Sequence, residues 1–392
     1  MSISKLFDFS YAQGYILFMH NEHSLRQSAD TVIHEVLDIK KGEQFLIITN
    51  PEKDVFEISQ ALYDAAIDAG VETTLVIQPV KTQLDFANLA ALAAFESQPD
   101  VCASISANKM GKDSKAITTP FITPDGRKID HIFHYQMDER KTLRAIWSPG
   151  ITVDMFRRTA GIDYALLQRR CAAISQAMTG AETIRVTAPG GTNILVPVSG
   201  RLPMSDNGDF TKGGDGGNIP AGEVFISPLP GKSEGLIVFD GSISLNSGDM
   251  ITETPVRVVL KNGYVTEITG GKEADLLRKS IEAGEKKAFD FEAEGKLDKG
   301  EGAAYAKNAR GLGELGIGLN PAAEIRGNML EDEKAFHTCH FAIGSNYDND
   351  ANAMIHLDCL VRNPTIIVNY PDGTNTVIEK DGILVAPFED IA

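Results

Sequence analysis

Residues 44–49, Gln-Phe-Leu-Ile-Ile-Thr, form a short apolar run that limits the folds open to this chain. A strand with apolar residues at consecutive positions is buried on both faces, which is typical of parallel sheets covered by helices. Asn50-Pro51 ends the run, and residues 55–69 follow with apolar side chains at helical spacing, up to a C-capping Gly70. The pattern therefore predicts a strand, a crossover helix and a parallel sheet.

The same alternation of strand and helix continues to about residue 150. Further strands are expected at 73–77, 101–104 and 132–135, with a helix at 86–95. A helix over 160–178 then leads out of this unit. Repeated strand–helix units predict a doubly wound α/β domain, which we place at residues 1–180. The sequence Thr49-Asn50-Pro51-Glu52 takes the place of phosphate-binding glycines after the first strand, so a dinucleotide site is not expected there.

From about residue 183 the pattern changes to short strands separated by turn residues. These strands are expected at 183–187, 193–198, 235–240 and 256–260, and again around 316–318. Asn262-Gly263 predicts a hairpin, because both positions of a type I′ turn need a positive φ. A helix at 274–289 interrupts the strands. We therefore expect residues 181–392 to form a β-rich α+β domain, which would be the metal-binding catalytic domain.

Charge and cysteine content limit the partners and the compartment. The net charge of −17 and the pI near 4.9 argue against nucleic acid or an anionic membrane as a partner, since both attract clustered positive charge. The four cysteines show no CxxC spacing, which indicates reduced thiols. No basic segment with an apolar leader and no run of about 20 apolar residues is seen, so a cytoplasmic protein is expected.

Three of the eight histidines, His337, His340 and His356, lie close together in sequence beside Glu333 and Asp358. Imidazole and carboxylate are the ligands of divalent first-row metals. His356 and Asp358 are two residues apart, so on a strand they point to the same face. His340 precedes an apolar segment and is a third candidate ligand, whereas His337 fits either a supporting or a surface position. The scattered remaining histidines are expected to have ordinary structural roles: His20, His23, His34, His131 and His134.

Two carboxylates far upstream join this set. Glu314 lies in an apolar segment punctuated by glycines, where a buried charge needs a metal, another cation or a proton. Glu223 begins an expected strand after the glycine-rich residues 212–222, which are either a flexible surface loop or a site of close backbone approach.

A serine or cysteine nucleophile is the competing chemistry. No Gly-x-Ser-x-Gly elbow is present. Cys339 and Cys359 each adjoin a candidate ligand, so in strands they should point away from the site. Nucleophilic catalysis by cysteine is therefore disfavoured.

The order of these motifs resembles that of the M29 metallo-aminopeptidases of the aminopeptidase T class, over most of the chain. The motifs are Gly222-Glu223-Val224-Phe225-Ile226-Ser227-Pro228, Gly313-Glu314, Cys339-His340-Phe341-Ala342-Ile343-Gly344 with Tyr347, and His356-x-Asp358. The resemblance implies a homodimer and two divalent metals, zinc, cobalt or manganese, held by Glu223, Glu314, Glu333, His340, His356 and Asp358. It also implies that a metal-bound water hydrolyses N-terminal peptide bonds, with Glu314 as metal bridge or general base and Tyr347 as donor to the oxyanion.

Two departures from the M29 pattern favour another branch. The segment between His340 and His356 is short, and the acidic residue before Cys339-His340 is displaced to Glu333. Both features are closer to a divergent branch that includes the dihydroxypyridine ring-opening dioxygenases. Those enzymes use one non-haem Fe(II), which a His, His, Asp triad could hold here.

We expect a metal-dependent aminopeptidase acting on a peptide or small-molecule substrate. The dioxygenase is the alternative, and a catalytically silent metal-binding protein is a third possibility.

Overall fold

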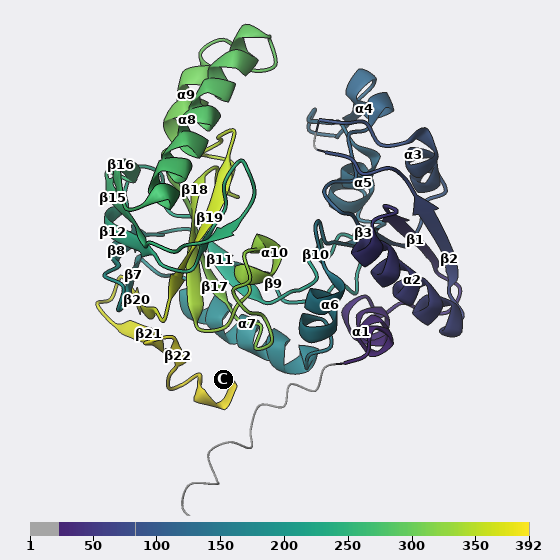
Figure 1. The fold of residues 1–392 in the computed structure, drawn as a ribbon, viewed down its shortest axis with the longest axis horizontal. Coiled ribbons are helices and arrows are strands. Elements are labelled where there is room, and N and C mark those ends of the chain that lie inside the picture. The colour runs from purple at the N-terminus through teal and green to yellow at the C-terminus, as the bar shows by residue number, and fades with distance from the viewer. Residues whose placement is uncertain (1–22, 83, 392) are drawn as a thin grey trace, which may run out of the picture.

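The computed structural model describes residues 23–82 and 84–391, which form a mixed α/β protein with several sheets. Figure 1 shows two units side by side, with the N-terminal unit in purple and blue and the C-terminal unit in green and yellow. His20, expected to be an ordinary residue, lies outside the described residues.

The N-terminal unit is built on a parallel sheet of order β10-β6-β3-β1-β2. Its strands are β1 (Gln44–Thr49), β2 (Glu72–Ile77), β3 (Val101–Ile105), β6 (Arg144–Trp147) and β10 (Gly216–Gly217). Its helices are α1 (Leu25–Thr31), a π-helix (Val32–Val36), α2 (Lys53–Asp68), α3 (Leu89–Glu96), α4 (Ser114–Thr118), α5 (Ile132–His134), a second π-helix (Tyr135–Glu139) and α6 (Val153–Thr159). A two-stranded sheet of β4 (Phe121–Ile122) and β5 (Lys128–Ile129) adjoins them. The predicted strand at 44–49 and the helix that follows it are confirmed.

The prediction of a strand at residues 132–135 was wrong. The chain there is helical, and the next strand of the sheet is β6. The reason is local, because the His131 side chain accepts a hydrogen bond from the backbone N–H of Phe133 and so caps the helix. Phe133 is buried against the sheet, so its apolar character reflects packing rather than strand pairing.

The helix expected over 160–178 is confirmed, but it begins four residues later than predicted and is separate from the helix before it. α6 ends at Thr159, and α7 (Tyr164–Met178) begins after Asp163, whose side chain accepts from the N–H of Leu166. α7 packs against β9, β11 and β21 of the C-terminal unit.

The C-terminal unit contains two antiparallel sheets. The first has the order β14-β13-β19-β18-β17-β11-β9, with β9 (Met204–Asp206), β11 (Glu223–Ile226), β13 (Ser242–Ile243), β14 (Met250–Ile251), β17 (Leu312–Gly318), β18 (Thr338–Gly344) and β19 (His356–Arg362). The second has the order β16-β15-β12-β8-β7-β20-β21-β22, with β7 (Thr183–Thr187), β8 (Asn193–Pro197), β12 (Glu234–Phe239), β15 (Val256–Lys261), β16 (Tyr264–Thr269), β20 (Thr365–Asn369), β21 (Asn375–Lys380) and β22 (Ile383–Leu384). The helices of this unit are α8 (Lys272–Ala293), α9 (Glu301–Asn308), α10 (Met329–Asp332) and a 3-10 helix (Glu389–Ile391).

The hairpin and the helix predicted in this unit are both confirmed. The predicted hairpin joins β15 and β16, with Asn262 at φ 50° and Gly263 at φ 73°. The predicted helix at 274–289 lies within α8. In the part of the chain that the structure covers, no helix combines the length and apolar character needed to cross a bilayer.

The glycine-rich residues 212–222 tie the two units together. Gly216 and Gly217 form β10, which pairs in parallel with β6 at the edge of the N-terminal sheet. A Cβ at Gly216 would lie 2.6 Å from the carbonyl oxygen of Ala145, so only glycine fits this close approach. Gly216 and Gly217 therefore lie in a short strand and not in a flexible surface loop.

Candidate metal centre

The candidate ligands lie on four neighbouring strands of the seven-stranded sheet. Glu223 is on β11, Glu314 on β17, His340 on β18, and His356 and Asp358 on β19. Side chains alternate between the faces of a strand, and the register of these strands places the five residues on one face. The neighbours that point the other way are buried and apolar: Leu315, Ile317, Cys339, Phe341, Leu357 and Cys359. Both cysteines thus point into the core, as expected.

A bulge sets the side on which Glu314 appears. Leu312 pairs with Ile343 and Glu314 pairs with Ala342, so Gly313 is an extra residue in β17. Without this bulge, Leu312 and Glu314 would face the same side; with it, Leu312 enters the core and Glu314 the site. A Cβ at Gly313 would lie 2.2 Å from the carbonyl oxygen of Ser345, so the bulge requires glycine.

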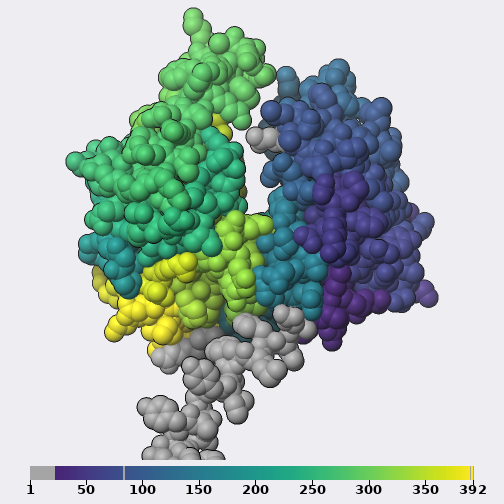
Figure 2. All heavy atoms as spheres, in the orientation of Figure 1, coloured from purple at the N-terminus to yellow at the C-terminus, as the bar shows by residue number. Residues whose placement is uncertain are grey.

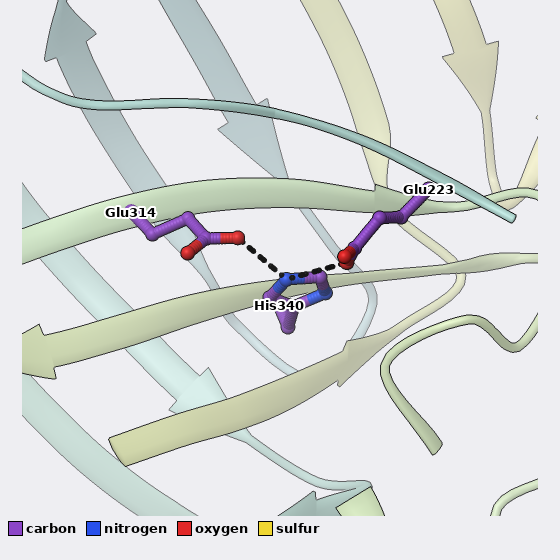
Figure 3. Close-up of side chains that lie close together, drawn as sticks. All are labelled: Glu223, Glu314 and His340. Atoms are coloured by element: carbon purple, nitrogen blue, oxygen red, sulfur yellow. Dashed lines mark hydrogen bonds and ion pairs between the residues drawn. The ribbon is translucent and has the colours of Figure 1, made fainter. Parts of the chain in front are cut away.

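His340 lies between two carboxylates, as Figure 3 shows. Its Nε2 is 3.0 Å from Oε1 of Glu314 and 3.5 Å from Oε2 of Glu223. The imidazole occupies the space above Gly316, where a Cβ would lie 2.0 Å from Nε2. His340, Glu223 and Glu314 are all buried.

His356 is oriented as a metal ligand. Its Nδ1 lies 2.9 Å from the carbonyl oxygen of Ser345, which can only accept, so Nδ1 carries the proton. Nε2 is therefore the ring atom left to bind a metal, and it lies 3.2 Å from both Oε2 of Glu314 and Oδ1 of Asp358. A backbone carbonyl that fixes the tautomer in this way is the usual support of metal-binding histidines.

Two groups of side chains are close enough to share one ion. The first is Glu223, Glu314 and His340, and the second is Glu314, His356 and Asp358. Each oxygen of Glu314 faces one of the two histidines. Oε2 of Glu223 and Oδ1 of Asp358 are buried without a hydrogen-bond partner, which a bound cation would supply. Nitrogen and oxygen donors in this arrangement fit a divalent first-row metal.

Lys334 is a functional candidate that the sequence did not reveal. Its ammonium is fully buried, 2.5 Å from Oε1 of Glu223, 2.7 Å from Oε1 of Glu333 and 3.7 Å from Oδ2 of Asp206. In the sequence, Lys334 follows three acidic residues, Glu331, Asp332 and Glu333, and resembles a solvated charge run. Asp206, on β9, was likewise not foreseen.

Burial and neighbouring charges shift the pKa values of the cluster's side chains, in some of them in opposite directions. Burial raises the pKa of Glu223 to about 8 and that of Asp206 to about 6. Burial opposes ionisation of Asp358 too, but the positive charge of the neighbouring His356 lowers its pKa to about 2. Burial would lower the pKa of His340, yet Glu314 raises it to about 9. Without a metal, the cluster therefore holds protons that an entering cation would displace.

A cleft between the two units leads to this cluster, and Figure 2 shows the molecule hollowed there. A cavity of about 610 Å³ is lined by Glu333 and Asp358 from one side and by Lys109 and Trp147 from the other. Trp147 also lines an adjoining cavity of about 1040 Å³ with Tyr347. Volumes of this size suit small molecules.

The structure brings most of the expected residues together. The ring of Tyr347 is 5.3 Å from that of His356, at the mouth of the site. Glu333 reaches the cluster through Lys334 rather than through a histidine. His337 lies outside it, because its Nδ1 bonds to the carbonyl oxygen of Gly382.

The other histidines that the structure describes, His23, His34, His131 and His134, belong to neither ligand group. His131 and His134 line the larger cavity. His134 also has an acidic partner, Asp138, which the sequence did not suggest.

Comparison with known proteins identifies relatives of this arrangement. The family model described as 2,5-dihydroxypyridine 5,6-dioxygenase matches residues 152–385. The curated 2,5-dihydroxypyridine 5,6-dioxygenase of Pseudomonas putida is 26% identical over 237 residues, which is 57% of this chain and 60% of the relative. The chain thus aligns with less than two thirds of that relative's length.

Solved structures share the fold. The 2,5-dihydroxypyridine dioxygenase from Pseudomonas putida KT2440 superposes with a TM-score of 0.66 at 18% identity, covering 93% of this chain and 98% of that one. Wild-type AmpT from Thermus thermophilus superposes with a TM-score of 0.61 at 16% identity, covering 92% and 99%. At these identities the likeness concerns the fold alone.

Proposed function

Because this chain belongs to the 2,5-dihydroxypyridine 5,6-dioxygenase family, we propose that it is a metal-dependent dioxygenase that opens the ring of a dihydroxylated nitrogen heteroaromatic. The observation that carries the proposal is the span of the family match, residues 152–385, which includes every candidate metal ligand. In this proposal residues 181–392 form the metal-binding unit, and the described part of residues 1–180 supplies the opposite wall of the cleft. The aminopeptidase expected first thereby becomes the second candidate.

Glu314, His356 and Asp358 are the residues that would hold one Fe(II) ion, in place of the His, His, Asp triad expected from the sequence, because His340 groups with Glu223 and Glu314 instead. They lie within reach of a shared ion, and Asp358 lines the cavity, so the metal would be open to substrate. Two carboxylates and one imidazole suit Fe(II) or Mn(II). A bound Fe(II) ion would supply the redox chemistry that oxygen-dependent ring opening requires.

The protein side chains would bind and orient the substrate. Trp147 offers a flat apolar surface on which an aromatic ring can stack. Glu333 lines the same cavity as Asp358 and is placed to accept a proton from a substrate hydroxyl. The cleft walls would limit the access of bulk water to the ring.

A two-metal aminopeptidase is the second candidate. The observation that favours it is that both ligand groups share Glu314, as a bridging carboxylate would. In that case zinc, cobalt or manganese would bind in pairs, and Tyr347 would donate to the oxyanion. A homodimer and a cytoplasmic location stay predictions from the sequence.

Oxygen consumption separates the two candidates. Protein stripped of metal and reloaded anaerobically with Fe(II) is mixed with 2,5-dihydroxypyridine and oxygen, and oxygen uptake is followed with loss of the ring absorbance. The same apoprotein loaded with zinc or cobalt is assayed on leucine p-nitroanilide. Oxygen uptake matched one-to-one with ring loss supports the dioxygenase; release of nitroaniline without oxygen uptake would establish the peptidase instead.

A matched pair of variants controls this experiment. Glu314→Gln removes a carboxylate from the proposed iron site and should abolish ring opening. Glu267→Gln makes the same change at an exposed position of β16 and should leave turnover unchanged.

A further inference from the structure

Lys334 delivers a positive charge to the carboxylate cluster from a rigid segment. Its N–H bonds to the carbonyl of Glu331 at 3.0 Å, and its carbonyl accepts from the N–H of Asn320 at 2.9 Å. The following residue, Ala335, crosses closely over Gly318, where a Cβ would lie 2.1 Å from the Ala335 carbonyl oxygen. The backbone is thus fixed on both sides, and the side chain has a defined path into the site.

The ammonium of Lys334 lies among three carboxylates whose negative charges need a nearby cation. Oε1 of Glu223 is 2.5 Å from the ammonium, Oε1 of Glu333 is 2.7 Å from it, and Oδ2 of Asp206 is 3.7 Å from it. A buried ammonium is tolerated only when carboxylates of this kind surround it. Conversely, these carboxylates would need another cation if the lysine were absent.

Glu223 links this lysine to one of the two groups of candidate ligands. Its Oε1 bonds to Lys334, whereas its Oε2 faces His340. A divalent ion held by Glu223, Glu314 and His340 would therefore lie close to the ammonium and be repelled by it. The second group, which contains His356 and Asp358, does not include a residue bonded to Lys334.

We propose that the Lys334 ammonium takes the place of a second metal ion, so that the centre binds one divalent metal through Glu314, His356 and Asp358. Loss of the lysine charge opens a second metal site at Glu223, Glu314 and His340. Lys334 is in this sense a positioning residue that sets metal stoichiometry. The inference rests on the proposed function in taking the centre as a one-metal site.

Metal counting tests the inference without an activity assay. Apoprotein is titrated with Mn²⁺ alone by isothermal calorimetry, and bound metal is measured after desalting. Wild-type protein should bind one equivalent, and Lys334→Met should bind two. Lys334→Arg keeps the charge and should again bind one. The electron paramagnetic resonance spectrum should change from that of an isolated Mn²⁺ ion to that of a coupled pair only in the methionine variant.

A second variant guards against misfolding. Lys334→Gln combined with Glu333→Gln removes the lysine together with one partner, leaves Glu223, Glu314 and His340 intact, and should also bind two equivalents. Two equivalents in wild-type protein, or only one in either folded neutral variant, would overturn the inference.

The two proposals fail in different ways. One bound metal without oxygen-dependent ring opening would refute the proposed function but not the role of Lys334. Ring opening by a protein that binds two metals would refute the role of Lys334 and leave the dioxygenase intact.

Discussion

The imidazole of His340 lies directly over Gly316, its partner residue across strands β18 and β17. A methyl group at Gly316 would meet the ring at 2.0 Å, closer than any non-bonded contact allows. Glycine at this position therefore determines where His340 can sit, and the position of His340 in turn supports Glu314 at 3.0 Å.

Gly316→Ala should push the imidazole away from Glu314. The backbone of Gly316 is not among those with positive φ, so alanine fits the strand and only the ring is displaced. We expect metal affinity to fall by roughly 10- to 100-fold, the usual effect of losing a supporting contact. Calorimetric titration with Mn²⁺ measures it. Leu315→Val, on the core face of the same strand, should lower the melting temperature instead; equal metal affinities in the two variants would contradict this role.

Asp358→Asn and Glu223→Gln distinguish the two groups of ligands. Each change replaces a carboxylate by the amide of the same shape. If the single metal binds beside Asp358, the first variant should lose at least about 100-fold in metal affinity and the second less than about 10-fold. Competition with a fluorescent chelator measures both constants. The reverse order would place the metal beside His340.

Trp147 should report binding in the cleft. It is the chain's single tryptophan, and it lines both cavities between the units. Anaerobic addition of 2,5-dihydroxypyridine to protein loaded with zinc should quench its fluorescence with a saturable dependence on concentration. Trp147→Phe removes the signal, and its weaker binding by calorimetry would show the contribution of stacking, roughly 3- to 10-fold in affinity. A linear, unsaturated decrease would mean that the ring does not bind there.

Glu379 should make the protein less stable as the pH rises. Both of its carboxylate oxygens are buried without a hydrogen-bond partner, and burial raises its pKa from 4.5 to about 8. Between these values the folded protein keeps a proton that the unfolded chain has lost. Stability therefore declines from about pH 4.5 to about pH 8, by up to about 1.4 kcal/mol per pH unit, and levels off above.

The variant Glu379→Gln isolates this effect. The difference in melting temperature between the variant and the wild-type protein should grow from pH 5 to pH 8 in favour of the variant. The exposed change Glu267→Gln should show no such trend. A difference that stays constant with pH would mean that Glu379 is already ionised in the folded protein.

Local patterns were a good guide to single elements. The apolar run 44–49 is a central strand, because burial on both faces selects apolar residues at consecutive positions. Asn262-Gly263 is a turn, because a positive φ selects asparagine and glycine. At residues 132–135 the same kind of pattern gave a wrong prediction. Their apolar side chains signalled burial, but the cap from His131 selected a helix.

The sequence alone placed His356 and Asp358 on one face of a strand, since side chains two residues apart in a strand point the same way. It also marked Glu314 as a charge that needs a partner. Only the tertiary structure decided which partner each ligand meets. Strand register joins Glu314 to both histidines, and the bulge at Gly313 turns it to their side. The lysine at 334 carries no local signal of burial, because two of its three carboxylate partners, Asp206 and Glu223, come from distant strands, and only their convergence makes a buried ammonium stable.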